Sequence, residues 1–383
     1  MSPLISKDRV KAKMMDEVYN MHDGKKTPAG PKKPSKAMIA VITVVLVLLL
    51  LIIIGVVVGN HYLNKIDIDT DDPSERTTLQ VDPEVKEEEN NLKNKIPQKY
   101  VKDFDTADEA IAKNIKNGTI WYHKDVYNLL LIGSDTRNPQ YYSRSDSMIL
   151  ISVNKQNQQV KMVSLLRAAY VNIPGHGNAR LNAAYSYGGP QLLIDTIEQN
   201  YKIHIDNYIS VDFTAFRKIV NILGGIDMQL TDAEAKALAG DFAAAGLAIP
   251  NGAGKYHMDG ATTLKYVRLR SIDSDRNRTQ RQRNVLNVII NKAKSMNINQ
   301  GLQLLDEILP LVKTDMSKST IISQAANAMR YIKWNITQDT IPHTHPKLVN
   351  IDGTEVLLLD WDQTVSYIHK LLYPGLEPQK IPA

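Results

Sequence analysis

Three apolar segments follow one another in the chain: YNLLLIG at Tyr127–Gly133, MILISV at Met148–Val153 and VKMVSLL at Val160–Leu166. Each segment has the length and composition of a buried strand. The polar residues Asn154–Gln159 are typical of a turn, so the last two strands are expected to form a hairpin.

Helical and strand patterns alternate after these three segments. This alternation predicts an α/β domain in which helices flank a mixed central sheet. The expected helices are Gln191–Tyr201, Phe213–Leu223 and Asn284–Met296, and the further strands are Tyr208–Val211 and Ile226–Leu230.

Composition excludes several classes of site. The chain has 383 residues, of which 43% are hydrophobic and 23% are charged, so it has enough apolar residues for a folded core. It has no Cys. This excludes disulfides, thiolate zinc sites, a cysteine nucleophile and iron–sulfur clusters.

The residues from Ala37 to Gly59 form an uncharged apolar run of 23 residues. A helix of that length spans a hydrocarbon core of about 30 Å. The run is longer than the apolar region of a cleaved secretory signal, which has about 7–15 residues. We therefore expect an uncleaved signal anchor in a single-pass protein of the cell membrane.

Charge on the two sides of this run predicts its orientation. Met1–Lys36 has nine Lys or Arg and four Asp or Glu, whereas His61–Asn90 has three and ten. Basic flanks remain in the cytoplasm. We expect a cytoplasmic tail at 1–36, the membrane helix at 37–59, an acidic extracellular stalk at 60–95 and an extracellular domain at 96–383 that begins near Ile96.

Two aspartates are expected at neighbouring ends of the first two strands. Asp135 lies just after the first strand and Asp146 just before the second, next to Arg137 and Arg144 respectively. Two carboxylates at adjacent strand ends have the chemistry to hold one Mg²⁺, while the arginines face its anionic ligand. The alternative is a pair of turn-forming aspartates.

Further arginines are expected at the same end of the sheet. Arg167 ends the third strand. The segment Tyr266–Arg270 alternates, so as a strand it would turn Arg268 and Arg270 to one face.

The residues that follow have the pattern of a helix start. Thr279 and Gln282 fit a capping box, which would place Arg278 and Arg281 at a helix N-terminus, where an anion is favoured. The alternative is a solvated basic start of a helix.

These residues together suit a diphosphate and a divalent cation, because guanidinium groups bind phosphate bidentately. Nucleic acid is disfavoured, because the domain is expected outside the membrane and no nucleic-acid motif is present. The arginines in question are Arg137, Arg144, Arg167, Arg268, Arg270, Arg278 and Arg281.

Two apolar stripes are most simply interpreted as core, although some of their residues could line a lipid channel. They are Phe213, Phe216, Ile219 and Val220, and Val285, Leu286, Ile289 and Ile290.

Taken together, these motifs resemble the LytR-CpsA-Psr family of membrane-anchored cell-wall glycopolymer ligases. The resemblance covers Asn128–Ile290 continuously, in the family's order. It is carried by NLLLIGSDTR, SRSDSMILISVN, MVSLLR, NIPGHGNARLNAAYSYGG, VDFTAFRKIVNILGGIDM and LKYVRLRSIDSDRNRTQRQ.

The resemblance implies an activity, in a bacterium of the Gram-positive type. A phosphoglycan such as teichoic acid or capsular polysaccharide would be transferred from a polyprenyl-diphosphate carrier to peptidoglycan, with release of polyprenyl phosphate. Asp135 and Asp146 match the magnesium-associated carboxylates, and Asp275 matches a motif carboxylate that would orient arginines or accept a proton. The positions that match diphosphate contacts are Arg144, Arg167, Arg268, Arg270, Arg278 and Gln282.

The chain departs from the family pattern at two places. Where the family has Ser-x-Pro-Arg-Asp, this sequence has Ser164-Leu165-Leu166-Arg167-Ala168, and Arg276-Asn277 replaces an aromatic-Gly pair. A carboxylate is therefore missing beside Arg167. Two alternatives stay open: a polyprenyl-diphosphate or wall-polymer binding protein that has lost turnover, and a hydrolase that uses water as the acceptor.

Overall fold

The computed structural model describes residues 64–65, 67–69, 80–135, 141–295, 307–331 and 333–382, all within one compact unit, Gly59–Ala383. The expected tail at 1–36, the expected membrane helix at 37–59 and Arg137 lie outside the described residues. Within the described ranges, no helix combines the length and the hydropathy needed to cross a bilayer.

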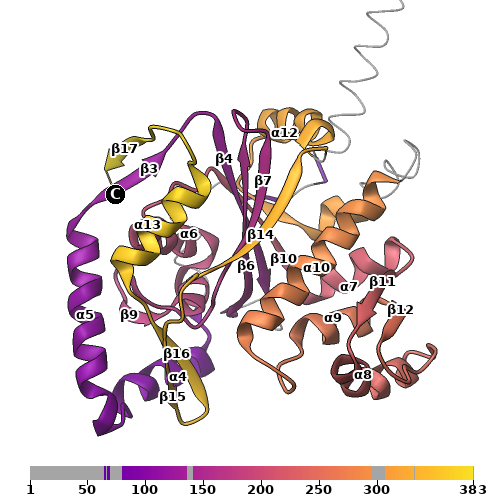
Figure 1. Ribbon diagram of the computed structural model, residues 1–383, viewed down its shortest axis with the longest axis horizontal. Helices are drawn as coiled ribbons and strands as arrows, with labels where there is room; N and C mark the ends of the chain where they lie inside the picture. Colours follow the sequence, from indigo (N-terminus) through magenta and orange to yellow (C-terminus); the bar gives the residue numbers. More distant parts are fainter. Residues whose placement is uncertain are drawn as a thin grey trace, which may run out of the picture. The chain divides into compact units, whose positions relative to one another are not determined.

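The centre of the described unit is a mixed sheet (Figure 1). β4, β6 and β7 are antiparallel neighbours, whereas β10 is parallel to β4 and β14 is parallel to β7. The predicted sheet and its hairpin are therefore confirmed. Its strand order is β1 (Asp67–Ile68), β13 (Lys313–Thr314), β10 (Asn207–Asp212), β4 (Val126–Ser134), β6 (Ser145–Asn154), β7 (Gln159–Leu165) and β14 (Asn335–Ile341).

Alternation along the strands gives the sheet two apolar faces. Leu130 and Leu150 are fully buried in the main core, whereas Leu129 and Ile151 belong to a smaller cluster. Figure 1 shows the helices that cover the main core on one side of the sheet. They are α5 (Val101–Lys116), α6 (Leu181–Tyr201) and α13 (Trp361–Leu372).

A second helical layer covers the other side of the sheet in Figure 1 and has its own apolar cluster. The cluster contains Met228 of β11, so the predicted strand at 226–230 exists but pairs with β12 rather than with the main sheet. The elements of this layer are α7 (Phe213–Ile222), β11 (Ile226–Leu230), α8 (Asp232–Ala244), β12 (Gly254–Met258), α9 (Gly260–Arg268) and α10 (Asp275–Lys294).

Two local predictions in this layer are wrong. Tyr266–Arg270 is not a strand, because α9 extends through Arg268. The side chain of Asp259 caps this helix by accepting from the N–H of Thr262 at 2.8 Å, and the buried Tyr266 packs in the helical cluster. Tertiary packing thus overrides the short alternating pattern.

The predicted capping box is also wrong, because α10 begins at Asp275, four residues before Thr279. The hydroxyl of Thr279 donates to the carbonyl of Arg276 at 2.9 Å, as expected within a helix. Arg278 nevertheless lies near the start of α10.

Residues 80–94 of the acidic segment form a strand and a helix, so the domain boundary predicted near Ile96 is wrong. β2 (Gln80–Val81) pairs with β5 (Tyr141–Tyr142), and α4 (Pro83–Asn94) buries Val85 and Leu92. The charge of this segment suggested a solvated stalk. Its structure differs because part of that charge is paired with arginines of the core, as described below.

The remaining elements close the ends of the unit. α12 (Lys318–Tyr331) packs through Tyr331 against the smaller sheet cluster. Three two-stranded pairs complete the described fold: β3 (Thr119–Tyr122) with β17 (Gln379–Pro382), β8 (Tyr170–Ile173) with β9 (Gly177–Arg180), and β15 (Lys347–Ile351) with β16 (Thr354–Leu358).

Candidate active site

The two carboxylates predicted to hold a metal lie at adjoining strand ends. Asp135 directly follows β4 and Asp146 is the second residue of β6, and the N–H of Asp135 donates to the carbonyl of Arg144 at 3.3 Å. Both carboxylates line a cavity of about 640 Å³ together with Arg144, Arg167 and residues of α4. The structure thus brings these four side chains to one cavity.

Each of these carboxylates has an arginine partner from a more distant part of the chain. The guanidinium of Arg167 is paired with Asp146. Arg268 Nη2 lies 3.4 Å from Asp135 Oδ2, and its guanidinium lies over the ring of Phe213, 4.5 Å from the ring centroid. The end of α9 and the start of α7 therefore meet at the strand ends.

Asp275, the first residue of α10, holds the arginines together. Its Oδ1 accepts from Arg278 Nε at 2.8 Å, and Arg167 Nε and Arg270 Nε lie 3.5 and 4.0 Å away. Burial alone would raise the pKa of Asp275, but the charges of these arginines lower it. The carboxylate is therefore ionised at neutral pH.

Arg278 connects this group of charges to the sheet. Its side chain is 2% exposed, and Nη1 donates to the carbonyl of Asp146 at 2.9 Å. Burial lowers its pKa. Its Nη2 is buried and, among the described residues, has no hydrogen-bond partner. An unpaired buried donor of this kind is costly unless a ligand satisfies it.

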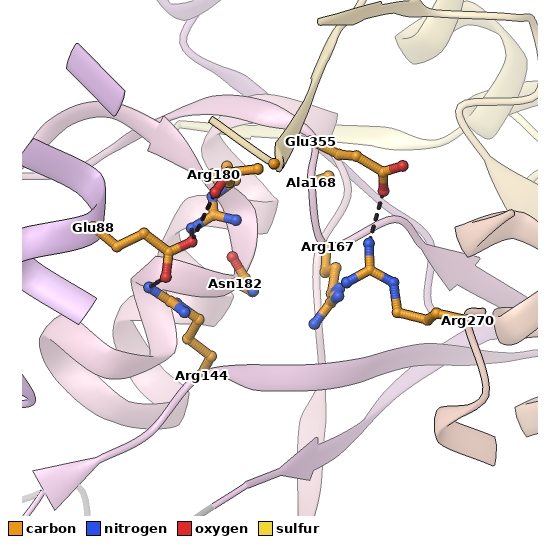
Figure 2. Close-up of a pocket in the computed structure, with 10 residues that line it drawn as sticks. Glu88, Arg144, Arg167, Ala168, Arg180, Asn182, Arg270 and Glu355 are labelled. Carbon is orange, nitrogen blue, oxygen red and sulfur yellow. Dashed lines mark hydrogen bonds and ion pairs between the residues drawn. The ribbon is translucent and has the colours of Figure 1, made fainter. Parts of the chain in front are cut away.

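A second cavity, of about 190 Å³, adjoins the first and shares Glu88, Arg144 and Arg167 with it. Figure 2 shows its arginines turned toward a common space, with Asn182 between them. The Oδ1 of Asn182 is buried and has no hydrogen-bond partner in the described part of the chain. The cavity is thus strongly polar and rich in hydrogen-bond donors.

Glu88 of α4 closes this space by binding two arginines. It lies 2.6 Å from Arg144 Nη2 and 2.7 Å from Arg180 Nη2. The neighbouring Glu89 is 2% exposed and accepts from Arg180 Nε at 3.0 Å. Burial would raise the pKa of Glu88, but Arg180 and Arg144 lower it. The acidic α4 is therefore part of the site.

The site is close to electroneutral. The arginines around the two cavities all have carboxylate partners, so positive and negative side chains nearly balance. The arginines are Arg144, Arg167, Arg180, Arg268, Arg270 and Arg278, and the carboxylates are Glu88, Glu89, Asp135, Asp146, Asp275 and Glu355.

Two of the predicted substrate-binding residues are held elsewhere. Arg281 is 4% exposed, with Nη1 2.7 Å from Asp273 Oδ2 and 3.4 Å from Glu234 Oε1, so its guanidinium joins α10 to α8 and to the loop after α9. Gln282 Nε2 donates to the carbonyl of Val267 at 3.4 Å. Neither residue lines the two cavities described above.

Three residues of the site were not predicted from the sequence: Arg180, Glu88 and Glu355. Arg180 lies inside the motif NIPGHGNARLNAAYSYGG. This motif supports the family resemblance, but it assigns no role to the arginine. Glu88 looked like one of many charges in an acidic segment. Glu355 lies about 85 residues after the arginine motifs, and no local pattern marks it.

Comparison with known proteins identifies the family. The chain matches the LytR_cpsA_psr family over residues 80–370, well over half of its length. The chain belongs to this family. The match begins at β2, so it includes α4 and starts well before Ile96.

Members of the LytR_cpsA_psr family include the relatives found by sequence. The chain is 33% identical over 214 residues to the polyisoprenyl-teichoic acid–peptidoglycan teichoic acid transferase TagT of Bacillus subtilis (strain 168), covering 55% of this chain and 65% of TagT. It therefore spans just under two thirds of that relative. It is also 33% identical over 224 residues to TagU of Enterococcus faecalis (strain ATCC 700802 / V583), covering 56% and 70% of the two chains.

Solved structures of the family share the fold. A structure of TagT bound to LIIa-WTA has a TM-score of 0.54 at 30% identity, covering 65% of this chain and 90% of that chain. Another, of the LytR-CPS2A-psr family protein YwtF (TagT) with bound octaprenyl pyrophosphate lipid, has a TM-score of 0.50 at 28% identity, covering 65% of this chain and 89% of that chain.

Proposed function

We propose that the chain transfers a phosphoglycan, of the teichoic acid or capsular polysaccharide type, from a polyprenyl-diphosphate carrier to peptidoglycan and releases polyprenyl phosphate. The observation that carries this proposal is that arginines from the loop after β7, from α9 and from α10 all contact Asp135 or Asp146, the two carboxylates of one cavity. Guanidinium groups at fixed positions suit a diphosphate. The names of the related transferases support the same reaction.

A magnesium ion would fit this reaction. Asp135 and Asp146 offer oxygen ligands in one cavity, and Mg²⁺ is commonly held by one or two carboxylates together with substrate phosphates. Among the described residues, no group of three or more His, Cys, Asp or Glu could hold a metal alone, so the substrate would have to complete the site. When bound, the ion would supply charge that an electroneutral site lacks.

The protein side chains would act through charge and position. The acceptor hydroxyl oxygen forms a bond to the phosphorus that carries the glycan, and the bond from that phosphorus to the bridging oxygen breaks. The bridging oxygen leaves with the polyprenyl phosphate, and the proton of the acceptor hydroxyl ends on this released phosphate or in solvent. Arg167, Arg270 and Arg278 would stabilise the negative charge on the phosphoryl oxygens during this exchange, because their guanidinium groups are already held by Asp275.

The lipid would lie beside the apolar start of α7. Phe213 is in contact with the guanidinium of Arg268, so an apolar surface reaches the diphosphate position directly. The membrane arrangement belongs to the same proposal: the run Ala37–Gly59 would anchor the chain, with the basic tail in the cytoplasm and the catalytic unit outside. Such an anchor would keep the unit close to its lipid-linked donor.

The destination of the glycan tests the proposal. The full chain in lipid vesicles is given a polyprenyl-diphosphate glycan with a labelled sugar and a peptidoglycan oligomer. We expect the label on the oligomer. Label on free polymer would favour the hydrolase alternative. A donor that binds but is not consumed would favour the alternative of a binding protein that has lost turnover.

The metal assignment has a separate test. Asp135→Asn removes one proposed ligand charge, and we expect transfer to fall by roughly 100-fold or more, because metal-ion stabilisation of the transition state is worth several kcal/mol. The unfolding midpoint of this variant serves as the control for folding. Unchanged transfer in Asp135→Asn at equal Mg²⁺ would contradict the role of this carboxylate.

A further inference from the structure

The hairpin β15–β16 forms one wall of the smaller cavity. Gly353, Thr354 and Glu355 line this cavity together with Ala168. The hairpin is fixed there, because the N–H of Leu357 donates to the carbonyl of Ala168 at 2.8 Å. Its apolar residues also belong to a buried cluster with Leu92 of α4 and Phe104 of α5, so this wall is a packed part of the fold.

Glu355 is the side chain that this hairpin contributes to the arginines. Its Oε2 accepts from Arg270 Nη2 at 2.9 Å (Figure 2). Figure 2 shows Ala168 between the side chain of Arg167 below it and that of Glu355. The other oxygen, Oε1, has no hydrogen-bond partner in the part of the chain that the structure describes.

Arg270 depends on such a partner. It lies two residues beyond the end of α9, in a segment without regular secondary structure, and its side chain is 45% exposed. Asp275 approaches it only to 4.0 Å, whereas Glu355 is at hydrogen-bond distance. The direction of the Arg270 guanidinium is therefore fixed chiefly by Glu355.

We propose that Glu355 is a positioning residue for the transfer reaction: from the C-terminal hairpin it supplies the carboxylate that this chain lacks at position 168, and so holds Arg270 over the cavity. This inference rests on the proposed function. Position 168 has only a methyl group, and its backbone is used to hold the hairpin that carries Glu355. The carboxylate thus reaches the arginines from another part of the chain.

Stability and activity are separable at this residue. The side chain of Glu355 is 32% exposed, and an ion pair of that exposure contributes little to folding. Replacement of Glu355 is therefore not expected to unfold the protein. An effect on the reaction would come from the orientation of Arg270.

The first experiment compares steady-state transfer by the full chain in vesicles and by its Glu355→Gln variant. We expect kcat to fall by at least about tenfold, because a misplaced catalytic group costs rate steeply, while KM for the donor changes by less than about threefold, because other arginines still meet the diphosphate. Asp352→Asn, on the same hairpin and outside the cavity lining, is the matched control and should behave as wild type. Equal kcat in Glu355→Gln and wild type would overturn the proposal.

The double variant Ala168→Asp/Glu355→Gln tests the exchange between the two positions. A carboxylate at position 168 would again lie next to the arginines, so we expect kcat to recover by at least about fivefold over Glu355→Gln alone. A conservative Glu355→Asp variant should lose less activity than Glu355→Gln, because it retains the charge. No recovery in the double variant would overturn the claim that Glu355 stands in for a carboxylate at 168.

Binding separates this inference from the proposed function. If the wild-type chain performs no transfer, the proposed function fails, and the role of Glu355 is decided with geranylgeranyl diphosphate as the probe. We expect Glu355→Gln to change the Kd by about twofold when Arg270 is present and to have no effect in an Arg270→Gln background. Equal effects of Glu355→Gln in the two backgrounds would overturn the proposal.

Discussion

At the scale of single residues, the site depends on carboxylates that hold arginines in place. Asp275 is the clearest case, because one of its oxygens lies within 4.0 Å of three guanidinium groups. It is also buried, so its charge is needed to offset that of Arg278. These contacts would let it position arginines, which is one of the two roles that the family resemblance implies for it.

Asp275→Asn is therefore expected to affect both folding and reaction. The substitution leaves the buried Arg278 without its charged partner, and breaking a buried ion pair on one side costs about 3–5 kcal/mol of folding free energy. Urea unfolding measures this loss, and transfer should fall in the same variant. Asp105→Asn, at an exposed position of α5, is the control. Equal unfolding midpoints for Asp275→Asn and wild type would contradict this account.

A second prediction at this scale concerns a buried lysine far from the arginines. Lys202 ends α6 and is 1% exposed, and its Nζ has no hydrogen-bond partner among the described residues. Burial lowers its pKa. Lys202→Met should raise the free energy of unfolding by about 1 kcal/mol, because it removes an unpaired buried polar group.

Urea unfolding checks this prediction, with Lys155→Met at an exposed position as the control. The carbonyl of Lys202, which accepts from the N–H of Trp121 at 3.0 Å, is unaffected by the change. A loss of stability in Lys202→Met would show that the ammonium group is satisfied in solution.

Residue patterns predicted part of the site for a physical reason. Asp135, Asp146 and Arg167 occur at strand ends, and strands that neighbour one another in the sheet bring their ends together. Arg281 follows no such rule: its neighbourhood suggested an anion site, but the side chain is used to pair with Asp273 and Glu234. Glu355 could not be found, because only the tertiary fold places its hairpin at the cavity.

At the scale of elements, α4 is the largest difference between expectation and structure. Composition favoured a solvated stalk, because most residues of the segment are charged or polar. The helix folds because Val85 and Leu92 are spaced to lie on one face, while Glu88 and Glu89 meet arginines. A helix with few apolar residues can therefore pack against the core when its charged side chains have partners there.

Leu92→Ala tests whether α4 contributes to the folded unit. The side chain is 8% exposed and packs with Phe104 and residues of the β15–β16 hairpin, so its loss should cost about 2–5 kcal/mol of unfolding free energy. Chemical denaturation measures the change. Glu87→Ala, on the exposed face of α4, should stay within about 0.5 kcal/mol of wild type. Similar unfolding free energies for Leu92→Ala and Glu87→Ala would instead support the interpretation of this segment as a solvated stalk.

The sheet was predicted more reliably than the helical layer beside it. β4, β6 and β7 are long and apolar, so pattern and packing agree. The five residues 266–270 carry too short a pattern to separate a strand from a helix, and the capping of α9 by Asp259 lies outside them.

At the scale of the whole molecule, acid stability should depend on a buried histidine that joins the N- and C-terminal elements. The ring of His369 on α13 stacks on Trp121 of β3, with ring centroids 3.9 Å apart, and Nε2 lies 2.9 Å from the carbonyl oxygen of Lys202. Burial lowers the pKa of His369 from 6.5 to about 4. The folded protein therefore favours the neutral imidazole.

The sign of the pH dependence follows from this pKa. As the pH falls below 6.5, the unfolded chain binds a proton at His369 before the folded protein does, so the contribution to stability is fully present above pH 6.5 and is lost toward pH 4. The loss should reach about 2 kcal/mol by pH 5, at about 1.4 kcal/mol per pH unit.

Unfolding measured between pH 7 and pH 5 in wild type and in His369→Gln isolates this contribution, since other titrating groups are common to both. We expect the variant to lose about 2 kcal/mol less than wild type over this range. His345→Gln, at an exposed position, should follow wild type. Parallel curves for wild type and His369→Gln would contradict the buried, neutral state of this ring.

The candidate site is assembled from the whole of the described fold. The strand ends of the central sheet supply the carboxylates Asp135 and Asp146, α9 and α10 bring arginines, and the smaller cavity is closed by Glu88 of α4 and Glu355 of the C-terminal hairpin. Elements that are distant in sequence thus supply the carboxylates that pair with these arginines. We propose that this arrangement breaks the diphosphate bond of a lipid-linked donor.

The most direct test is the release of polyprenyl phosphate by the full chain in vesicles, given a polyprenyl-diphosphate glycan and a peptidoglycan oligomer, with Mg²⁺ and again after chelation by EDTA. We predict release that accompanies joining of the glycan to the oligomer and that stops on chelation. No release of polyprenyl phosphate with Mg²⁺ present and the donor bound would contradict the claim.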